Sequence, residues 1–426
     1  MPCVLFLGVA IATSVRTPAL SNNDEQFHIQ YALYLRSHHA LPLISVQNGD
    51  ESQQPPLYYL SLAIWMKGLG MPEFNPALPP EPVSATNLDG FDHVYTTATE
   101  RQLAVDVHLL RLPSIGYGLV AVLAAFGSAW ILTRRVSIAS ATASTVALWP
   151  KFIVVAASVS NESMTDAFCA LALLVLLLWL RAERRRVLWA GIAGLLLGLA
   201  VITKFTALPV AGLLLLVVVV RSVMRRWWRD PLLAVAAFAA VSGWWFVRNT
   251  ALYGDPLAAS ATLRFLNQFI AHLVVPSFNH SLSGYWIPWL VNSVWYQGGA
   301  NQLMLPWDLA LAVSVLALPC LGWGAWVVWK HWRREPSSRL DLPLLGLAAA
   351  AAVAGWVLLC YQITQAPARY LLVSITAWAV LLVAGIDHLT FLPAAVRRGA
   401  VWFWPLVFAG LDAYVFAQYL IPHGGF

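Results

Sequence analysis

An acidic segment near the N-terminus carries the first residues whose types and spacing could do chemistry. It reads Ser21-Asn22-Asn23-Asp24-Glu25-Gln26-Phe27-His28. A carboxylate such as Asp24 or Glu25 can accept a proton as a general base, or it can simply favour the first turn of a helix. Residues 21–23 offer the expected N-cap of that helix. Asp24 and His28 are four residues apart, so they would share one helix face.

The residues that follow indicate how this segment is held. Phe27, Tyr31, Tyr34 and Leu35 recur at the spacing of one apolar stripe on a helix. A helix with such a stripe and a polar opposite face lies on a membrane surface. The pattern therefore predicts an amphipathic surface helix that begins near Asp24.

A second segment, Gln53-Gln54-Pro55-Pro56-Leu57-Tyr58-Tyr59, follows in the same polar region. Two adjacent prolines cannot lie inside a regular helix, but they can open one. The apolar stretch from Tyr58 to Met66 is too short to cross a bilayer, which needs about 20 residues. We expect a second interfacial helix here, and a simple membrane-anchoring turn is the alternative.

Four basic residues stand at the predicted outer ends of apolar segments: Lys151, Lys204, Arg248 and Arg369. Each could reach toward lipid headgroups. Together, on the side that bears the acidic segment, they indicate a convergent anion site instead. Arginine in particular can bind a phosphate through two hydrogen bonds.

A further polar run, residues 161–166, lies at the mouth of an apolar segment. Asp166 would sit at membrane depth, where an acid is unusual and suggests function. An ordinary helix cap explains the run equally well. Both interpretations stay open from the sequence.

The composition indicates the environment in which all these residues must work. Of the 426 residues, 59% are hydrophobic and 11% are charged, whereas soluble domains carry roughly 25% charged residues. Most of the chain therefore belongs in lipid, and its net charge of +6 follows from loop charges rather than from nucleic-acid binding. The four cysteines suggest small buried side chains and neither a zinc site nor a disulfide framework.

The apolar runs predict an all-α polytopic membrane protein with about 11 transmembrane helices. A first run at 2–15 has no basic region before it, which argues against a signal peptide. It is shorter than the roughly 20 residues a span needs, which suggests a first helix clipped by a misplaced start. The others are 109–133, 136–157, 164–181, 187–203, 206–221, 231–248, 304–329, 341–361, 369–386 and 400–420. None alternates like a barrel strand, and no internal repeat is evident.

The basic residues orient this bundle. Sixteen of the 26 lie in five short connections, at 134–135, 181–186, 221–229, 330–339 and 397–398. The positive-inside rule makes these connections cytoplasmic. The long segments 21–108 and 249–303 then lie outside, as elaborations of a single membrane domain spanning 1–426.

With these features in place, the chain resembles the GT-C superfamily of lipid-phosphate-sugar-dependent glycosyltransferases. Within it, the chain is similar to bacterial relatives of protein mannosyltransferases and of the lipid A aminoarabinose transferase. The resemblance rests on Asp24-Glu25 with His28, on Gln54-Pro55-Pro56-Leu57-Tyr58-Tyr59, on Trp245-Phe246-Val247-Arg248-Asn249 with Tyr253-Gly254-Asp255-Pro256, and on Gln365 with Arg369-Tyr370-Leu371-Leu372.

The resemblance implies transfer of a sugar from a polyprenyl-phosphate donor to an acceptor hydroxyl, with inversion, on the non-cytoplasmic side of the plasma membrane. It implies Asp24 as general base, with Glu25 beside it, and Arg248, Arg369 and Lys204 as cations for the leaving phosphate. His28, Gln53, Gln54, Tyr58 and Tyr370 would complete substrate binding. Family members often carry a basic residue at the position of Gln54, so here the other cations must hold the phosphate.

Other functions remain open from the sequence. Glu25 and His28 could bind a divalent metal, although two ligands do not make a site and no cofactor is firmly implied. The acceptor could be an envelope glycan, a lipid or a protein. A lipid flippase or solute transporter, or a non-catalytic partner in envelope assembly, would also fit a polytopic chain.

Overall fold

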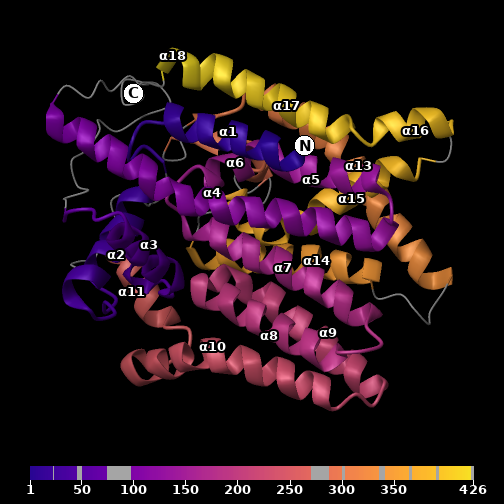
Figure 1. The fold of residues 1–426 in the computed structure, drawn as a ribbon, viewed down its shortest axis with the longest axis horizontal. Helices are drawn as coiled ribbons and strands as arrows, with labels where there is room; N and C mark the ends of the chain where they lie inside the picture. The colour runs from indigo at the N-terminus through magenta and orange to yellow at the C-terminus, as the bar shows by residue number, and fades with distance from the viewer. Residues whose placement is uncertain are drawn as a thin grey trace.

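The computed structural model describes residues 1–22, 24–45, 50–73, 97–269, 287–299, 303–334, 341–363, 367–389 and 393–423. Its long helices run side by side across one bundle (Figure 1). Helices α2, α3 and α11 gather at the left end in that view, and α16 lies at the right end. We call the end of the bundle that carries α2, α3 and α11 the elaborated end. The opposite end carries the short connections.

The elements follow in chain order. They are α1 (Pro2–Arg16), α2 (Glu25–His38), η2 (Asp50–Gln53), α3 (Leu57–Gly68), α4 (Ala98–Thr133), α5 (Val136–Ala147), α6 (Pro150–Ala156), α7 (Asn161–Arg181), α8 (Arg186–Thr203), η3 (Phe205–Ala207), α9 (Leu208–Met224), α10 (Arg229–Tyr253), α11 (Ala259–Phe269), α12 (Ile287–Ser293), β1 (Gln297–Gly298), β2 (Leu303–Met304), α13 (Trp307–Arg334), α14 (Asp341–Ile363), η5 (Ala368–Ser374), α15 (Ile375–Asp387), α16 (Ala394–Ala400), α17 (Phe403–Val415), η6 (Phe416–Leu420) and α18 (Ile421–His423).

The all-α prediction is confirmed. Within the described residues, nine helices are long and apolar enough to cross a membrane, or ten if the bent pair α5–α6 counts as one span. The short α1 adds an eleventh apolar helix. Each of the eleven predicted runs therefore corresponds to one of these segments, in order.

The prediction of one continuous helix over 136–157 is wrong. The segment breaks between α5 and α6, and the two halves are bent by 63°. Pro150 begins α6, and its missing N–H cannot continue the hydrogen bonding of α5. Lys151, the second residue of α6, has a buried side chain.

Helix α2 begins one residue later than expected. Asp24 itself is the N-cap, in a left-handed conformation with φ of 63° and with no capping hydrogen bond from its side chain, so the N-cap predicted at 21–23 is wrong. The predicted stripe is only partly buried: Tyr31 and Leu35 are covered, whereas Phe27 and Tyr34 are partly exposed. The buried face also includes polar Glu25 and His28, which face protein rather than lipid.

The prediction that Pro55 and Pro56 open a second helix is confirmed. Pro56 is the N-cap of α3, and Tyr58, Tyr59 and Leu62 form its buried face. This face packs against α2, so the two short helices form one unit at the elaborated end (Figure 1).

The long helices approach one another closely where small residues face a neighbour. At Gly194 on α8, an added Cβ would overlap the backbone carbonyl of Ala234 on α10.

At the end opposite α2 and α3, ion pairs join the basic connections, and Arg135 bonds Asp387 at 2.8 Å. Arg186 bonds Asp230 at 2.6 Å in the same way.

Candidate active site

The centre of the site is an ion pair between two residues that the sequence singled out. Arg369 Nη2 donates to Asp24 Oδ2 at 2.9 Å. Arg369 is the second residue of η5, which begins directly after Pro367, and its Nε also lies 3.1 Å from Glu162 Oε1. The Asp24 side chain keeps 22% of its surface exposed. This carboxylate is thus oriented by a cation and still accessible.

Lys204 lies on the other side of Glu162. Its Nζ donates to Glu162 Oε1 at 2.8 Å and to Asn161 Oδ1 at 3.0 Å. Lys204 ends α8 in an extended conformation, which turns its side chain toward the start of α7. Ser160 caps that start by accepting from the Glu162 backbone N–H at 3.2 Å. One buried acid therefore pairs with two buried cations.

The polar run 161–166 divides into two parts. Asn161 and Glu162 face the cations, whereas Asp166 lies about one turn further along α7 and is also buried. Sequence reasoning missed Glu162 as a site residue. The signal was present in the pattern: an acid in the first turn of a span, on the side where four basic residues end neighbouring helices.

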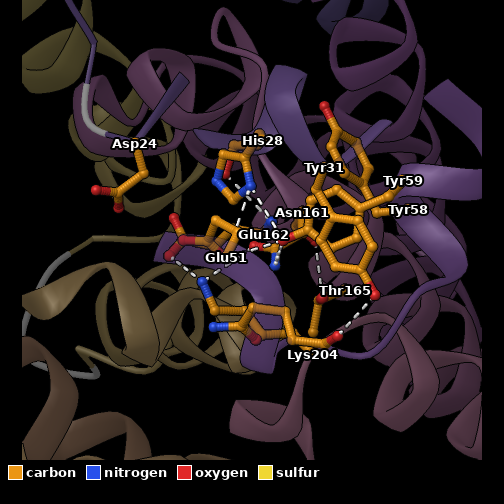
Figure 2. A network of polar contacts seen from close by, with 12 residues as sticks. Asp24, His28, Tyr31, Glu51, Tyr58, Tyr59, Asn161, Glu162, Thr165 and Lys204 are labelled. Carbon is orange, nitrogen blue, oxygen red and sulfur yellow. Dashed lines mark hydrogen bonds and ion pairs between the residues drawn. The ribbon is translucent and has the colours of Figure 1, made fainter. Parts of the chain in front are cut away.

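A hydrogen-bond network links Lys204 to residues of α2 and α3 (Figure 2). The Tyr59 hydroxyl donates to Glu51 Oε2 at 2.9 Å and accepts from Asn161 Nδ2 at 3.0 Å. His28 Nδ1 lies 3.1 Å from the same hydroxyl. The path from Glu51 through Tyr59 and Asn161 to Lys204 is therefore continuous. Neither Glu51 nor Tyr59 was predicted as a residue of the site.

Burial sets the protonation of this network. It lowers the pKa of His28 below its ordinary value of 6.5, and the nearby Glu51 and Asp24 carboxylates only partly offset this effect. The imidazole is therefore neutral at pH 7. Burial also raises the pKa of Tyr59 well above 10.0, so its hydroxyl keeps its proton.

Glu25 has different partners from its neighbour Asp24. Arg111 binds both carboxylate oxygens of Glu25, at 2.8 Å and 2.7 Å, and both side chains are fully buried. The Val159 N–H donates to the same carboxylate at 2.9 Å. Arg111 also donates to the backbone carbonyls of Ser14, Thr17 and Pro18. Through Arg111, Glu25 therefore links α1, α2 and α4.

Glu25 and His28 therefore do not converge on one point where a metal could sit. Glu25 is engaged by Arg111, and His28 faces Tyr59 and Glu51. In the part of the chain that the structure describes, no group of three or more His, Cys, Asp or Glu residues could hold a metal ion.

The other predicted binding residues divide into near and distant ones. The Tyr370 ring lies 5.3 Å from Lys204 Nζ and 5.4 Å from the Arg369 guanidinium, within cation–π range. The Tyr58 hydroxyl instead pairs with Ser114 at 3.0 Å, inside the protein. Arg248 donates to the Pro42 carbonyl at 2.8 Å and so holds the loop after α2.

The two glutamines before Pro55 belong to the turn that leads into α3. The Gln54 backbone carbonyl accepts from the Tyr31 hydroxyl at 3.3 Å. Gln53 ends η2, next to Glu51 of the network. Gln365 falls outside the described residues.

A cavity that opens to solvent adjoins the ion pairs. Its lining includes Asn22, Lys151, Ser158, Glu162, Gln297 and Arg369. Lys151 Nζ donates to the Gln297 backbone carbonyl at 2.8 Å. The arrangement joins an accessible carboxylate to a cavity rich in cations and hydrogen-bond donors. It could hold an anion and remove a proton beside it.

Comparison with known proteins places this geometry in a known fold. The family model for dolichyl-phosphate-mannose-protein mannosyltransferase matches residues 81–276. The crystal structure of ArnT from Cupriavidus metallidurans bound to undecaprenyl phosphate aligns over 99% of this chain and 73% of its own, at 14% identity and a TM-score of 0.54. The chain has the GT-C fold. No curated protein matches its sequence.

A second GT-C structure agrees. The archaeal oligosaccharyltransferase AglB from Archaeoglobus fulgidus, in complex with an inhibitory peptide and a dolichol-phosphate, aligns over 100% of this chain and 56% of its own. The identity is 12% and the TM-score is 0.55. The predicted GT-C resemblance is therefore confirmed for the fold, while the roles of individual residues rest on their geometry.

Proposed function

We propose that this GT-C protein transfers a sugar from a polyprenyl-phosphate donor to an acceptor hydroxyl, with inversion, on the non-cytoplasmic side of the plasma membrane. The observation that carries the proposal is the accessible Asp24 carboxylate, paired with Arg369 beside a cation-lined cavity. The family match supports it, as do two neighbours bound to undecaprenyl phosphate and dolichol-phosphate.

In the proposed reaction, Asp24 accepts the proton of the acceptor hydroxyl. The hydroxyl oxygen forms a bond to the anomeric carbon while the bond from that carbon to the phosphate oxygen breaks. The electron pair of the broken bond leaves with the polyprenyl phosphate. Attack opposite the leaving group inverts the anomeric configuration.

Arg369 links the two halves of this chemistry. It holds Asp24 through Nη2 while it faces Glu162 and the cavity through the rest of its guanidinium. A cation fixed there would stabilise the charge that develops on the departing phosphate without reorganising during the reaction. Lys204 holds Glu162 and Asn161 in place and contributes positive charge nearby.

The two ends of the bundle support the proposed orientation. Asp24 belongs to the end that bears α2 and α3, and the basic connections lie at the opposite end (Figure 1). Under the positive-inside rule, the site faces the non-cytoplasmic side. The acceptor would then be an envelope glycan, lipid or protein.

The test is a deletion strain complemented with the wild type or with Asp24→Asn. Mass spectrometry of envelope glycans, lipids and glycoproteins should show one sugar missing in the deletion, restored by the wild type and not by the variant. Purified protein in proteoliposomes should then transfer that sugar from its polyprenyl phosphate. An unchanged set of envelope sugars in the deletion strain would contradict the proposal.

A further inference from the structure

Among the described residues that line the cavity, Lys151 is a cation that forms no ion pair with an acid. Arg369 pairs with Asp24, and Lys204 pairs with Glu162. Lys151 keeps only 3% of its surface exposed, and no carboxylate of a described residue forms an ion pair with it. Its Nζ contacts Gln297 alone, through the backbone carbonyl at 2.8 Å and the side-chain oxygen at 3.4 Å. A buried ammonium without a counterion is costly unless a ligand supplies one.

Two amide donors beside Lys151 are also unsatisfied. Gln297 is 1% exposed and Asn22 is 6% exposed. Within the described residues, Gln297 Nε2 and Asn22 Nδ2 have no hydrogen-bond partner. A donor that is buried and unpaired loses its hydrogen bonds to water and gains none in return, which destabilises the protein unless a ligand supplies the acceptor. Both amides line the same cavity as Lys151 and Arg369.

We propose that this cavity binds the phosphoryl group of the lipid donor, with Lys151, Gln297 and Asn22 as its direct ligands. The inference rests on the proposed function and names the phosphate contacts within it. An anion there would satisfy one ammonium and two amides together, with Arg369 on the adjoining wall. The Glu162 carboxylate on that wall repels the anion toward Lys151.

The cations then have separate tasks. Lys151 contacts the phosphate directly. Lys204 is a positioning residue, since its ammonium is already bonded to Glu162 and Asn161. Arg248 does not contact the phosphate, because its guanidinium donates to the Pro42 carbonyl in the loop after α2. The ligands come from α6, β1 and the loop after α1, three segments that the fold brings to one cavity.

The first experiment measures binding of undecaprenyl phosphate to the full-length protein in nanodiscs. Lys151→Met keeps the length of the side chain and removes its charge. Because a hydrogen bond to a charged group contributes about 1.5–3 kcal/mol, affinity should fall about 10- to 100-fold. The control is Lys67→Met, an exposed lysine on α3, which should bind like the wild type. Equal affinity of Lys151→Met and the wild type would overturn the proposal.

A second variant guards against a folding defect. Gln297→Glu places a carboxylate where an amide oxygen already lies 3.4 Å from Lys151 Nζ. It supplies the missing counterion and removes one donor. The unfolding temperature of the lipid-free protein should therefore stay equal or rise, while affinity for the lipid phosphate falls at least about 10-fold. Binding at wild-type strength would contradict a phosphate in this cavity.

The source of the anion is tested with two further ligands. Undecaprenol, which lacks the phosphate, should bind at least about 10-fold more weakly than undecaprenyl phosphate. Inorganic phosphate should compete, and Lys151→Met should weaken that competition. If inorganic phosphate alone binds as tightly as the lipid, the cavity serves free phosphate and the lipid assignment is overturned.

These results are separable from the proposed function. Lipid-phosphate binding that depends on Lys151, in a protein that transfers no sugar, upholds the cavity and refutes the transferase. Sugar transfer that depends on Asp24, with unchanged lipid affinity in both Lys151→Met and Gln297→Glu, upholds the transferase and refutes the cavity.

Discussion

Asp24 and Arg369 are 345 residues apart in the chain, yet Oδ2 of one and Nη2 of the other lie 2.9 Å apart. Asp24 caps α2 at the elaborated end of the bundle, and Arg369 stands in the short helix η5 that leads into α15. The contact therefore closes the site only when the first and last parts of the chain have packed together.

Replacing Asp24 by asparagine tests the base directly. The amide keeps the shape of the side chain but cannot accept the proton. Positioned general bases contribute about 10²- to 10⁴-fold, so transfer should fall by at least about 100-fold. Lipid-phosphate binding should be retained, and the unfolding temperature should fall only modestly, because Arg369 keeps its ion pair with Glu162.

The matched control for this variant is Asp308→Asn, an exposed acid in the first turn of α13. It should transfer sugar like the wild type. Transfer at the normal rate by Asp24→Asn would refute the assignment of the base.

Glu25 and Arg111 should determine stability rather than catalysis. Removing one member of a buried ion pair leaves a charge without its partner and costs about 3–5 kcal/mol. Arg111→Met and Glu25→Gln should each lower the unfolding temperature, and the double variant should be less destabilised than the two separate losses combined. The measurement is thermal unfolding in detergent, with exposed Arg101→Met on the same helix as control.

The opposite outcome has a clear meaning. If Glu25→Gln unfolds like the wild type and yet loses transfer, Glu25 is catalytic, as the family resemblance implies.

The close packing of α8 on α10 should reverse the usual effect on stability of replacing a helical glycine by alanine. Alanine usually stabilises a helix relative to glycine by about 1 kcal/mol. Gly194→Ala should instead destabilise, because its Cβ would overlap the Ala234 carbonyl and force the helices apart. Gly212→Ala on α9 meets no atom within 4 Å and should be neutral or stabilising. Thermal unfolding of the two variants decides the point, and equal shifts would contradict it.

The sequence predicted the bundle well because lipid imposes a simple rule on long apolar runs. It did not locate the break before Pro150, because the run 136–157 was assigned from its apolar character alone, although Pro150 lacks the N–H that a continuing helix needs. Directly after that break, Lys151, one of the four cations expected to converge on an anion site, lines the cavity.

The sequence also predicted some residues of the candidate site and missed others. Lys204 and Arg369 were predicted because outer cations oppose the positive-inside trend. Glu162 was missed because an acid after a serine cap also fits an ordinary helix start. Adjacent Asp24 and Glu25 could not be distinguished by type alone. Tertiary contacts separate them, since one meets Arg369 and the other Arg111.

His28 should make stability depend on pH. Burial lowers its pKa below 6.5 in the folded protein, so below that pH the unfolded chain binds a proton that the folded chain does not. Stability is then greatest above pH 6.5 and decreases as the pH falls. In His28→Gln, the unfolding temperature should change less between pH 6.5 and 5. Parallel curves for the variant and the wild type would show that His28 contributes nothing to the dependence.

Tyr59 and Tyr58 form a matched pair for testing the network. Both are buried on α3, and each hydroxyl has a hydrogen-bond partner. Phenylalanine at either position should cost about 1 kcal/mol of stability. Only the Tyr59 hydroxyl, however, joins Glu51 to Asn161 and hence to Lys204.

We therefore expect Tyr59→Phe to lower kcat by about 10-fold, a loss equivalent to about 1.4 kcal/mol of transition-state stabilisation, with little change in KM for the donor. Tyr58→Phe should keep both constants near wild type at a similar unfolding temperature. Steady-state kinetics with a purified lipid donor make the comparison. If both variants lose activity in proportion to their stability, the network only supports the fold. If only Tyr59→Phe loses kcat, its hydroxyl positions the cation side of the site, because lost packing would affect both variants alike.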